Sequence, residues 1–197
     1  MLDCLTHYYY SNVIPFKTLS ALPESEAIRL MNELYADTPL GGRFKDPVLH
    51  LRDRKNTEKW LRDEFKLKGG CPTEEYPIYF VLGFYQEFED FIAREKMKCI
   101  KLPLSKFPEK EISFTFFDSM YSYKLGLDKP PQYYQAQYHG KVFTLQEIFS
   151  IIEEKEKSQE NWWGNIPKDY FPFIEAQVWN YELIQDIYNE VKSANRQ

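Results

Sequence analysis

The sequence predicts one α+β domain, residues 1–197, in which helices flank a mostly antiparallel β-sheet, either continuous or split. Three observations lead to this prediction. The chain has 197 residues, a length that suits a single well-buried core. Aromatic residues make up 17% of it while only 8 residues are Gly, which favours strands over Gly-rich phosphate loops. Strand-like and helix-like segments follow one another without the regular βαβ alternation of a doubly wound fold.

Five segments have the character of strands, because β-branched and aromatic residues run together or alternate between turn-forming residues. They are 5–10, 76–82, 97–104, 112–117 and 171–179. In the last of them a period of two places Glu175 and Gln177 on one face, between Phe173 and Trp179. The opposite face is apolar, so we expect that opposite face to contact the core.

Helices are predicted where capping residues precede an apolar stripe of helical spacing. Asp46-Pro47 is an N-cap and N1 pair for a helix that stops at Gly69-Gly70. The segment Thr144-Leu-Gln-Glu147 matches the capping box, in which side chains satisfy two helix-start amides. The other expected helices begin after Pro23, span 84–94 and 182–192, or form a turn that Asp118 caps through 123.

The charge distribution is uneven. The net charge is -5, yet residues 43–68 hold nine Lys and Arg against five acids, which leaves +4 there and -9 elsewhere. This stretch is either a solvated helix face or a basic surface for phosphates. Three cysteines without C-x-x-C spacing, and three isolated histidines, predict no metal site and no disulfide framework. With no long apolar segment, we expect a soluble, cytoplasmic protein that does not enter a membrane.

Glu175 is the strongest candidate for chemistry. A carboxylate held between aromatic rings can accept a hydrogen bond from a sugar hydroxyl and stabilise positive charge at an anomeric carbon. A glycosidase would need a second carboxylate across the scissile bond, and the sequence assigns none. If solvent covers this face, Glu175 and Gln177 are ordinary exposed strand residues.

Four further residues suit a nucleotide ligand. His7 and Tyr9 share a face of the first strand and could bind ribose hydroxyls, unless His7 is a satisfied structural residue. Arg52 and Arg54 could clamp a diphosphate, or be surface charges. The aromatic, proline-rich segment 130–138 is expected to be a surface lid, and it could dock a protein partner.

Three segments, 6–10 (Thr-His-Tyr-Tyr-Tyr), 112–123 and 139–145, resemble an uncharacterised bacterial protein family with no established activity. The order of features along the chain also resembles the ADP-ribosyltransferase fold, especially the bacterial toxins that modify nucleic acid. Those enzymes place a His on the first strand, an aromatic-rich strand near the middle and a catalytic Glu on a late strand. His7, the Tyr79-Phe80 pair and Glu175 occupy these places.

The resemblance implies that the chain uses NAD as a substrate and transfers ADP-ribose to an acceptor. Glu175 would then be catalytic, with Arg52 or Arg54 as the arginine near the cofactor. The residues implied to be catalytic are Glu175 and Arg52, and those implied to contact NAD are His7, Tyr9, Arg54, Tyr79, Phe80 and Gln177.

One departure from the family concerns the acceptor. Members that modify proteins carry Gln or Glu two residues before the catalytic Glu, whereas here Gln177 follows Glu175. We therefore expect a nucleic-acid or small-molecule acceptor. Two alternatives stay open: a non-catalytic immunity or regulatory module that binds a protein through 130–138, and an enzyme acting on another nucleotide or sugar.

Overall fold

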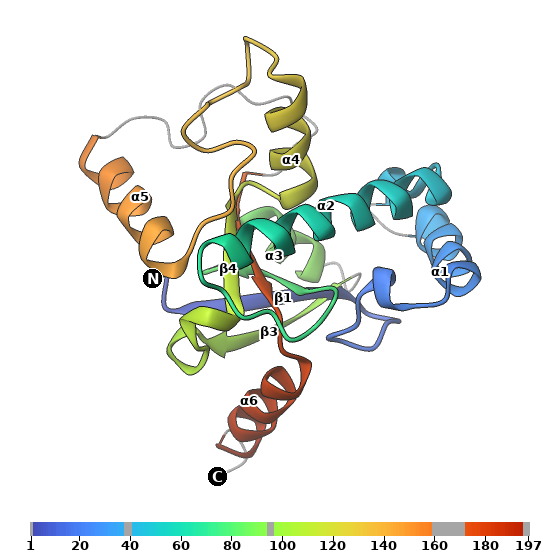
Figure 1. Ribbon diagram of the computed structural model, residues 1–197. Coiled ribbons are helices and arrows are strands. Elements are labelled where there is room, and N and C mark those ends of the chain that lie inside the picture. The colour runs from blue at the N-terminus through green and yellow to red at the C-terminus, as the bar shows by residue number, and fades with distance from the viewer. Residues whose placement is uncertain (1, 38–40, 94–96, 159–171, 195–197) are drawn as a thin grey trace.

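The computed structural model describes residues 2–37, 41–93, 97–158 and 172–194 (Figure 1). Its centre is a five-stranded sheet with the strand order β3-β1-β2-β5-β4, and every pairing is antiparallel. The strands are β1 (Cys4–Tyr10), β2 (Ile78–Leu82), β3 (Met97–Pro103), β4 (Ile112–Phe116) and β5 (Ile174–Val178). The predicted α+β class and antiparallel sheet are confirmed, and these five strands form one continuous sheet.

Six helices surround the sheet in the part of the chain that the structure describes. They are α1 (Glu24–Asp37), α2 (Pro47–Leu67), α3 (Gln86–Ala93), α4 (Ser119–Asp128), α5 (Leu145–Ser158) and α6 (Tyr181–Ala194). In Figure 1, α2 runs across the front of the sheet, with α1 at one of its ends and α4 near its middle. The predicted helix starts are confirmed to within two residues.

The predicted caps form as hydrogen bonds. The carboxylate of Asp46 accepts the backbone N–H of Leu49 at 2.9 Å, one turn into α2. At the start of α5, Thr144 N–H donates to Glu147 at 2.9 Å, and Glu147 N–H donates to the Thr144 hydroxyl at 3.3 Å. Local side-chain chemistry therefore sets where both helices begin.

One face of the sheet carries the main core. Ile174, Ala176 and Val178 of β5 are buried there, as their alternation predicts. Side chains of α5 and α6 cover this face; the fully buried ones are Ile148 and Ile184. Burial of these apolar side chains supplies the hydrophobic stabilisation of the sheet.

The opposite face is polar at its centre and apolar at its ends. Thr6, Tyr79, Thr115, Glu175 and Gln177 lie on it, as the strand registers require. Separate apolar clusters flank this centre, and α2 contributes Leu61 and Phe65 to the one that contains Trp179. A polar strip is thus enclosed between apolar packing on both sides.

The segment 130–138 contributes part of the core. The Tyr138 ring is buried and stacks on Phe116 with centroids 4.5 Å apart, while Lys155 Nζ lies 4.7 Å from the same ring. Gly140, with a φ of +68, lets the following turn approach α4 so closely that a Cβ there would lie 2.7 Å from the Gly126 Cα. Tyr138 is therefore unavailable to the protein partner considered for this segment.

Candidate functional site

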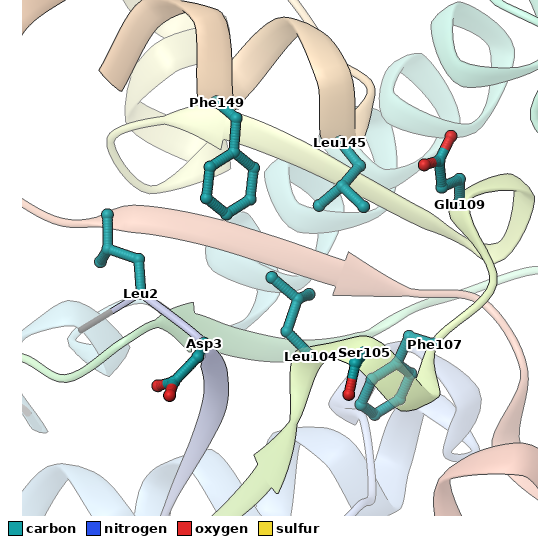
Figure 2. A pocket seen from close by; sticks show the side chains of 8 residues that line it. All are labelled: Leu2, Asp3, Leu104, Ser105, Phe107, Glu109, Leu145 and Phe149. Atoms are coloured by element: carbon teal, nitrogen blue, oxygen red, sulfur yellow. The ribbon is translucent and has the colours of Figure 1, made fainter. Parts of the chain in front are cut away.

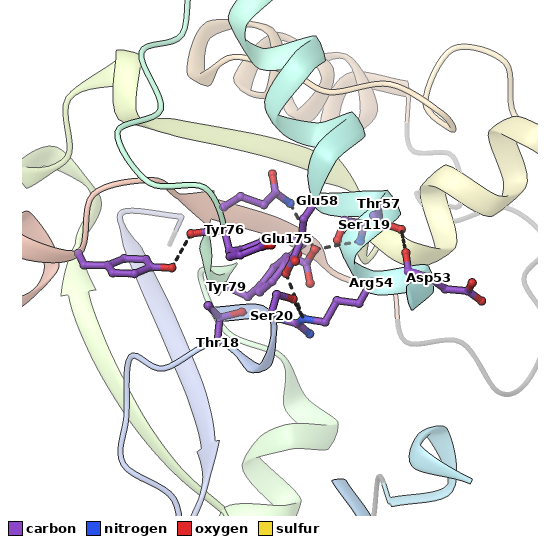
Figure 3. Close-up of polar contacts among 12 residues, drawn as sticks. Thr18, Ser20, Asp53, Arg54, Thr57, Glu58, Tyr76, Tyr79, Ser119 and Glu175 are labelled. Atoms are coloured by element: carbon purple, nitrogen blue, oxygen red, sulfur yellow. Dashed lines mark hydrogen bonds and ion pairs between the residues drawn. The ribbon is translucent and has the colours of Figure 1, made fainter. Parts of the chain in front are cut away.

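The predicted pairing of Glu175 with Gln177 on one face of β5 is confirmed. In the register of the sheet, Tyr79 lies opposite Gln177 and Val81 lies opposite Glu175. The side chains of Tyr79 and Glu175 point toward the middle of α2, which carries Arg54 and Glu58 (Figure 3). Three elements remote in sequence thus meet at one polar site.

The start of α4 holds the Glu175 carboxylate. Oε2 of Glu175 accepts the backbone N–H of Ser119, the first residue of α4, at 2.9 Å. The same oxygen accepts Nε2 of Gln177 at 3.3 Å. These donors and the positive end of the helix dipole favour the ionised carboxylate, and the side chain remains partly exposed.

Gln177 is fully engaged inside the sheet. Its Oε1 accepts the Ser113 hydroxyl at 2.9 Å, and its Nε2 donates to Thr115 Oγ1 at 3.1 Å. The side chain is completely buried. The structure therefore does not present Gln177 for the expected contact with a cofactor: its amide orients Glu175 instead.

Arg54 packs on Tyr79. Its guanidinium carbon lies 4.6 Å from the centre of the Tyr79 ring, which is a cation–π contact. Arg54 Nε pairs with Oε1 of Glu58 at 3.0 Å, and the Tyr79 hydroxyl donates to the same oxygen at 3.0 Å. Burial is the main cause that raises the pKa of Tyr79, and the neighbouring charge of Glu58 raises it further.

The segment before α1 supplies two further contacts to Arg54. Its Nε donates to the Ser20 hydroxyl at 3.2 Å, and its Nη2 donates to the Thr18 hydroxyl at 3.3 Å. Both hydroxyl-bearing residues are buried. Arg54 is thus fixed in one orientation by an acid, an aromatic ring and two hydroxyls, with 17% of its side chain exposed.

A second carboxylate, Asp118, acts electrostatically on Glu175. Asp118 caps α4 by accepting the Tyr121 N–H at 3.0 Å. Burial, and after it the negative charge of Asp118, raise the pKa of Glu175 to about 7. Burial also raises the pKa of Asp118, against the positive charges of Arg43 and Arg54. Near neutral pH, Glu175 therefore exchanges a proton within a paired-carboxylate site.

We expect Glu175 to make folding depend on pH. Its folded pKa of about 7 lies above the ordinary 4.5, so the stability contributed by the protonated form is fully present below 4.5 and lost as pH rises through 7. Glu175→Gln removes this loss and also relieves Asp118 of a neighbouring charge. The variant should therefore gain stability over the natural protein as pH rises.

Urea denaturation at pH 5 and pH 8 measures this difference. The contributions of His7, His50 and His139, whose pKa values burial lowers to about 4, 3 and 4, are common to both proteins and cancel. A stability difference that is the same at both pH values would contradict the elevated pKa of Glu175.

His7 faces away from Glu175. His7 follows Thr6, which pairs with Val81 on the face of Glu175, so His7 lies on the other face, with Phe80 and Ala176. Its Nδ1 bonds the Tyr79 carbonyl at 2.8 Å, and its Nε2 accepts the Phe16 N–H at 3.1 Å. Both ring nitrogens are thus occupied by backbone, so the structure does not leave His7 a free nitrogen for the expected contact with a ribose. His7 is the satisfied structural residue of the alternative interpretation.

Tyr9 and Phe80 belong to the same far face. The rings of Tyr9 and His7 stack with centroids 5.8 Å apart, and Phe80 is buried beside His7 at 5.3 Å. Neither ring reaches the face of Glu175, so the structure does not bring Tyr9 or Phe80 to the group that Glu175, Arg54 and Tyr79 form. Of the aromatic pair on β2, only Tyr79 lies at the site.

Arg52 lies on the solvent side of α2. Two residues along a helix correspond to a rotation of about 200°, so Arg52 points away when Arg54 points toward the sheet. Its side chain is 68% exposed and pairs with Asp53 at 3.1 Å. Arg52, expected to be catalytic, therefore lies outside the group around Glu175, and Arg54 is the arginine that lies there.

Sequence reasoning did not assign five residues that build the site. They are Thr18, Ser20, Glu58, Ser119 and, except as a helix cap, Asp118. The one usable signal was the spacing of four residues between Arg54 and Glu58, which places both on one face of α2. The contacts of Thr18 and Ser119 depend on packing between distant segments, which no local pattern records.

Two cavities in the described part of the protein lie elsewhere. One of about 530 Å³ is bordered by Leu104, Phe107 and Phe149 near the start of α5 (Figure 2). Another of about 280 Å³ is bordered by Tyr85 and Phe173. Neither of these two cavities is lined by Glu175, Arg54 or Tyr79.

Within the described ranges, no cluster of three or more His, Cys, Asp or Glu is arranged to hold a metal ion. The three cysteines are free thiols. None of the described helices combines the length and apolar content needed to cross a membrane. Comparisons with protein-family models, curated proteins and solved structures found no match to the chain.

Proposed function

We propose that this protein is an NAD-dependent ADP-ribosyltransferase in which Glu175 is the catalytic carboxylate. The observation that supports the proposal most is the meeting of Glu175 with Arg54 and Tyr79 on one sheet face. A carboxylate that can stabilise a sugar cation lies next to a fixed guanidinium and an aromatic ring. A charged sugar nucleotide presents the groups that these three side chains bind.

The proposed reaction breaks the bond between C1′ of the nicotinamide ribose and the nicotinamide nitrogen. The bonding electrons leave with nicotinamide, which becomes neutral, and positive charge develops on the ribose. The ionised Glu175 stabilises this charge. An oxygen or nitrogen of the acceptor then forms a bond to C1′ and loses one proton, so the products are nicotinamide, a proton and the ADP-ribosylated acceptor.

Three chain groups have separate roles in this proposal. Glu175, held by the Ser119 N–H and Gln177, faces the reacting ribose. Arg54 binds phosphate oxygens of NAD, because a guanidinium presents a planar fork of donors. The Tyr79 ring packs against the Arg54 guanidinium and lines the site. His7 has no part in the reaction, since its nitrogens are bonded to backbone.

The acceptor is proposed to be a nucleic acid or a small molecule. Several basic side chains of the stretch 43–68 pair with acids, which lowers the net positive charge that this surface presents. Lys59 pairs with Asp63, and Lys68 pairs with Glu147. A single base or nucleotide therefore fits this surface better than a long polyanion bound along α2.

Binding of NAD is tested by thermal unfolding together with an assay of nicotinamide release. NAD at 100 times its dissociation constant should stabilise the protein by about 2.7 kcal/mol, which raises the melting temperature by roughly 5–10 °C. Nicotinamide should appear in the same samples, with water or an added nucleotide as acceptor. Absence of both the shift and the release would refute the proposed function.

A further inference from the structure

Glu58 is an acid whose burial the reaction proposed above does not explain. Its side chain has 0% exposure, although an isolated charge is among the costliest groups to bury. Oε1 contacts Arg54 Nε and accepts the Tyr79 hydroxyl, and the Ser20 side chain also forms a hydrogen bond with the carboxylate. Oε2 is buried without a hydrogen-bond partner in the described residues. A buried, half-satisfied carboxylate calls for a specific reason.

The contacts of Glu58 show what it controls. One oxygen joins the guanidinium that rests on a ring to the hydroxyl of that same ring. The Arg54 guanidinium, the Glu58 carboxylate and the Tyr79 side chain therefore each contact the other two. The Ser20 hydroxyl shares Nε of Arg54 with Glu58, and the Thr18 hydroxyl accepts Nη2, so these contacts together hold the guanidinium in one orientation. Without Glu58, the strongest of these restraints is lost.

We infer that Glu58 is a positioning residue that fixes Arg54 for binding the anionic, phosphate-bearing part of the substrate. This inference rests on the proposed function and deepens it. Glu58 does not touch the substrate. It acts through Arg54, which is pre-organised so that little side-chain entropy is lost when an anion binds. The hydroxyl of Tyr79, on β2, donates a hydrogen bond to the Glu58 carboxylate and so helps to hold it.

The inference is tested with Glu58→Gln, which preserves side-chain volume and an acceptor oxygen but removes the charge that holds Arg54. We expect the dissociation constant of NAD to rise roughly tenfold or more, because the contact that orients Arg54 loses its charge assistance. In steady state the loss should fall mainly on KM rather than on kcat. Asp63→Asn, an exposed acid on the same helix, is the matched control.

A double-mutant cycle separates positioning from a general loss of stability. Affinities are measured by calorimetry with NAD in a Glu175→Gln background, where turnover does not interfere. Because Glu58 acts through Arg54, adding Glu58→Gln to Arg54→Gln should cause little further loss. A full, additive loss in the double variant would overturn the inference, as would an unchanged affinity in Glu58→Gln.

Failure of the proposed function has a different signature. If the protein neither binds NAD nor releases nicotinamide, the function is wrong, and the role of Glu58 toward that substrate is wrong with it. If NAD binds and reacts but Glu58→Gln behaves like Asp63→Asn, only the role of Glu58 is wrong. The variant Tyr79→Phe keeps the ring against the Arg54 guanidinium. It should weaken NAD binding less than Glu58→Gln.

Discussion

Glu175→Gln is expected to lower nicotinamide release from NAD by at least about 100-fold, because it removes the charge that stabilises the developing ribose cation. The substitution is nearly isosteric. Its side-chain oxygen can still accept the Ser119 N–H, the 2.9 Å contact that anchors Glu175 to α4. The fold should therefore be retained, and an equal or higher melting temperature at pH 8 is expected. The rate is measured by chromatography of released nicotinamide.

The matched control is Glu33→Gln, the same chemical change at an exposed position of α1 that pairs with Arg29. This variant should keep the natural rate. If Glu175→Gln still turns over NAD at a rate close to that of the control, Glu175 is not the catalytic carboxylate. Substrate affinity should change less than the rate, because the lost interaction is strongest in the transition state.

Arg54→Gln should lower kcat/KM for NAD by roughly 10- to 100-fold, whereas Arg52→Gln should stay within about twofold of the natural protein. The two arginines lie two residues apart on α2 but on opposite sides of it. Arg54 contacts Tyr79 and Glu58 over the sheet, and Arg52 is 68% exposed beside Asp53. The pair of variants tests the position of the charge, since both remove one guanidinium.

Initial rates over a range of NAD concentrations, with circular dichroism as a check on folding, measure this effect. A loss in Arg52→Gln equal to that in Arg54→Gln would mean that the overall charge of α2 attracts the substrate, rather than a built site. A normal kcat/KM in Arg54→Gln would mean that the group of Arg54, Glu58 and Tyr79 takes no part in catalysis.

Most elements of the fold could be predicted from short patterns. The capping box at Thr144 and the N-cap at Asp46 are local, because each involves residues within one helical turn. The alternation along β5 correctly placed Glu175 and Gln177 on the face opposite Ala176. These predictions succeed because local hydrogen bonds and backbone periodicity set them, independently of the rest of the chain.

The candidate site could be predicted only in part. The structure brings Glu175, Tyr79 and Arg54 together, but it does not bring His7, Tyr9, Phe80 or Arg52 to them. Alternation fixes which residues of one strand share a face. It does not fix how the faces of two strands correspond, since that depends on the register between strands that pair across a long loop. The sequence therefore showed that His7 and Tyr9 share a face of β1, but it did not show that this face is the one opposite Glu175.

By itself, the sequence determined the helices with their caps, the strands and the polar face of β5, because these follow from residues close together in the chain. Only the tertiary structure decided that β2 lies beside β5 and that α2 brings Arg54 and Glu58 over Tyr79. The same packing placed the start of α4 against Glu175. Such contacts join residues up to 100 positions apart, as Ile78 and Val178 are, and their geometry is set by the packing of the whole core rather than by any local pattern.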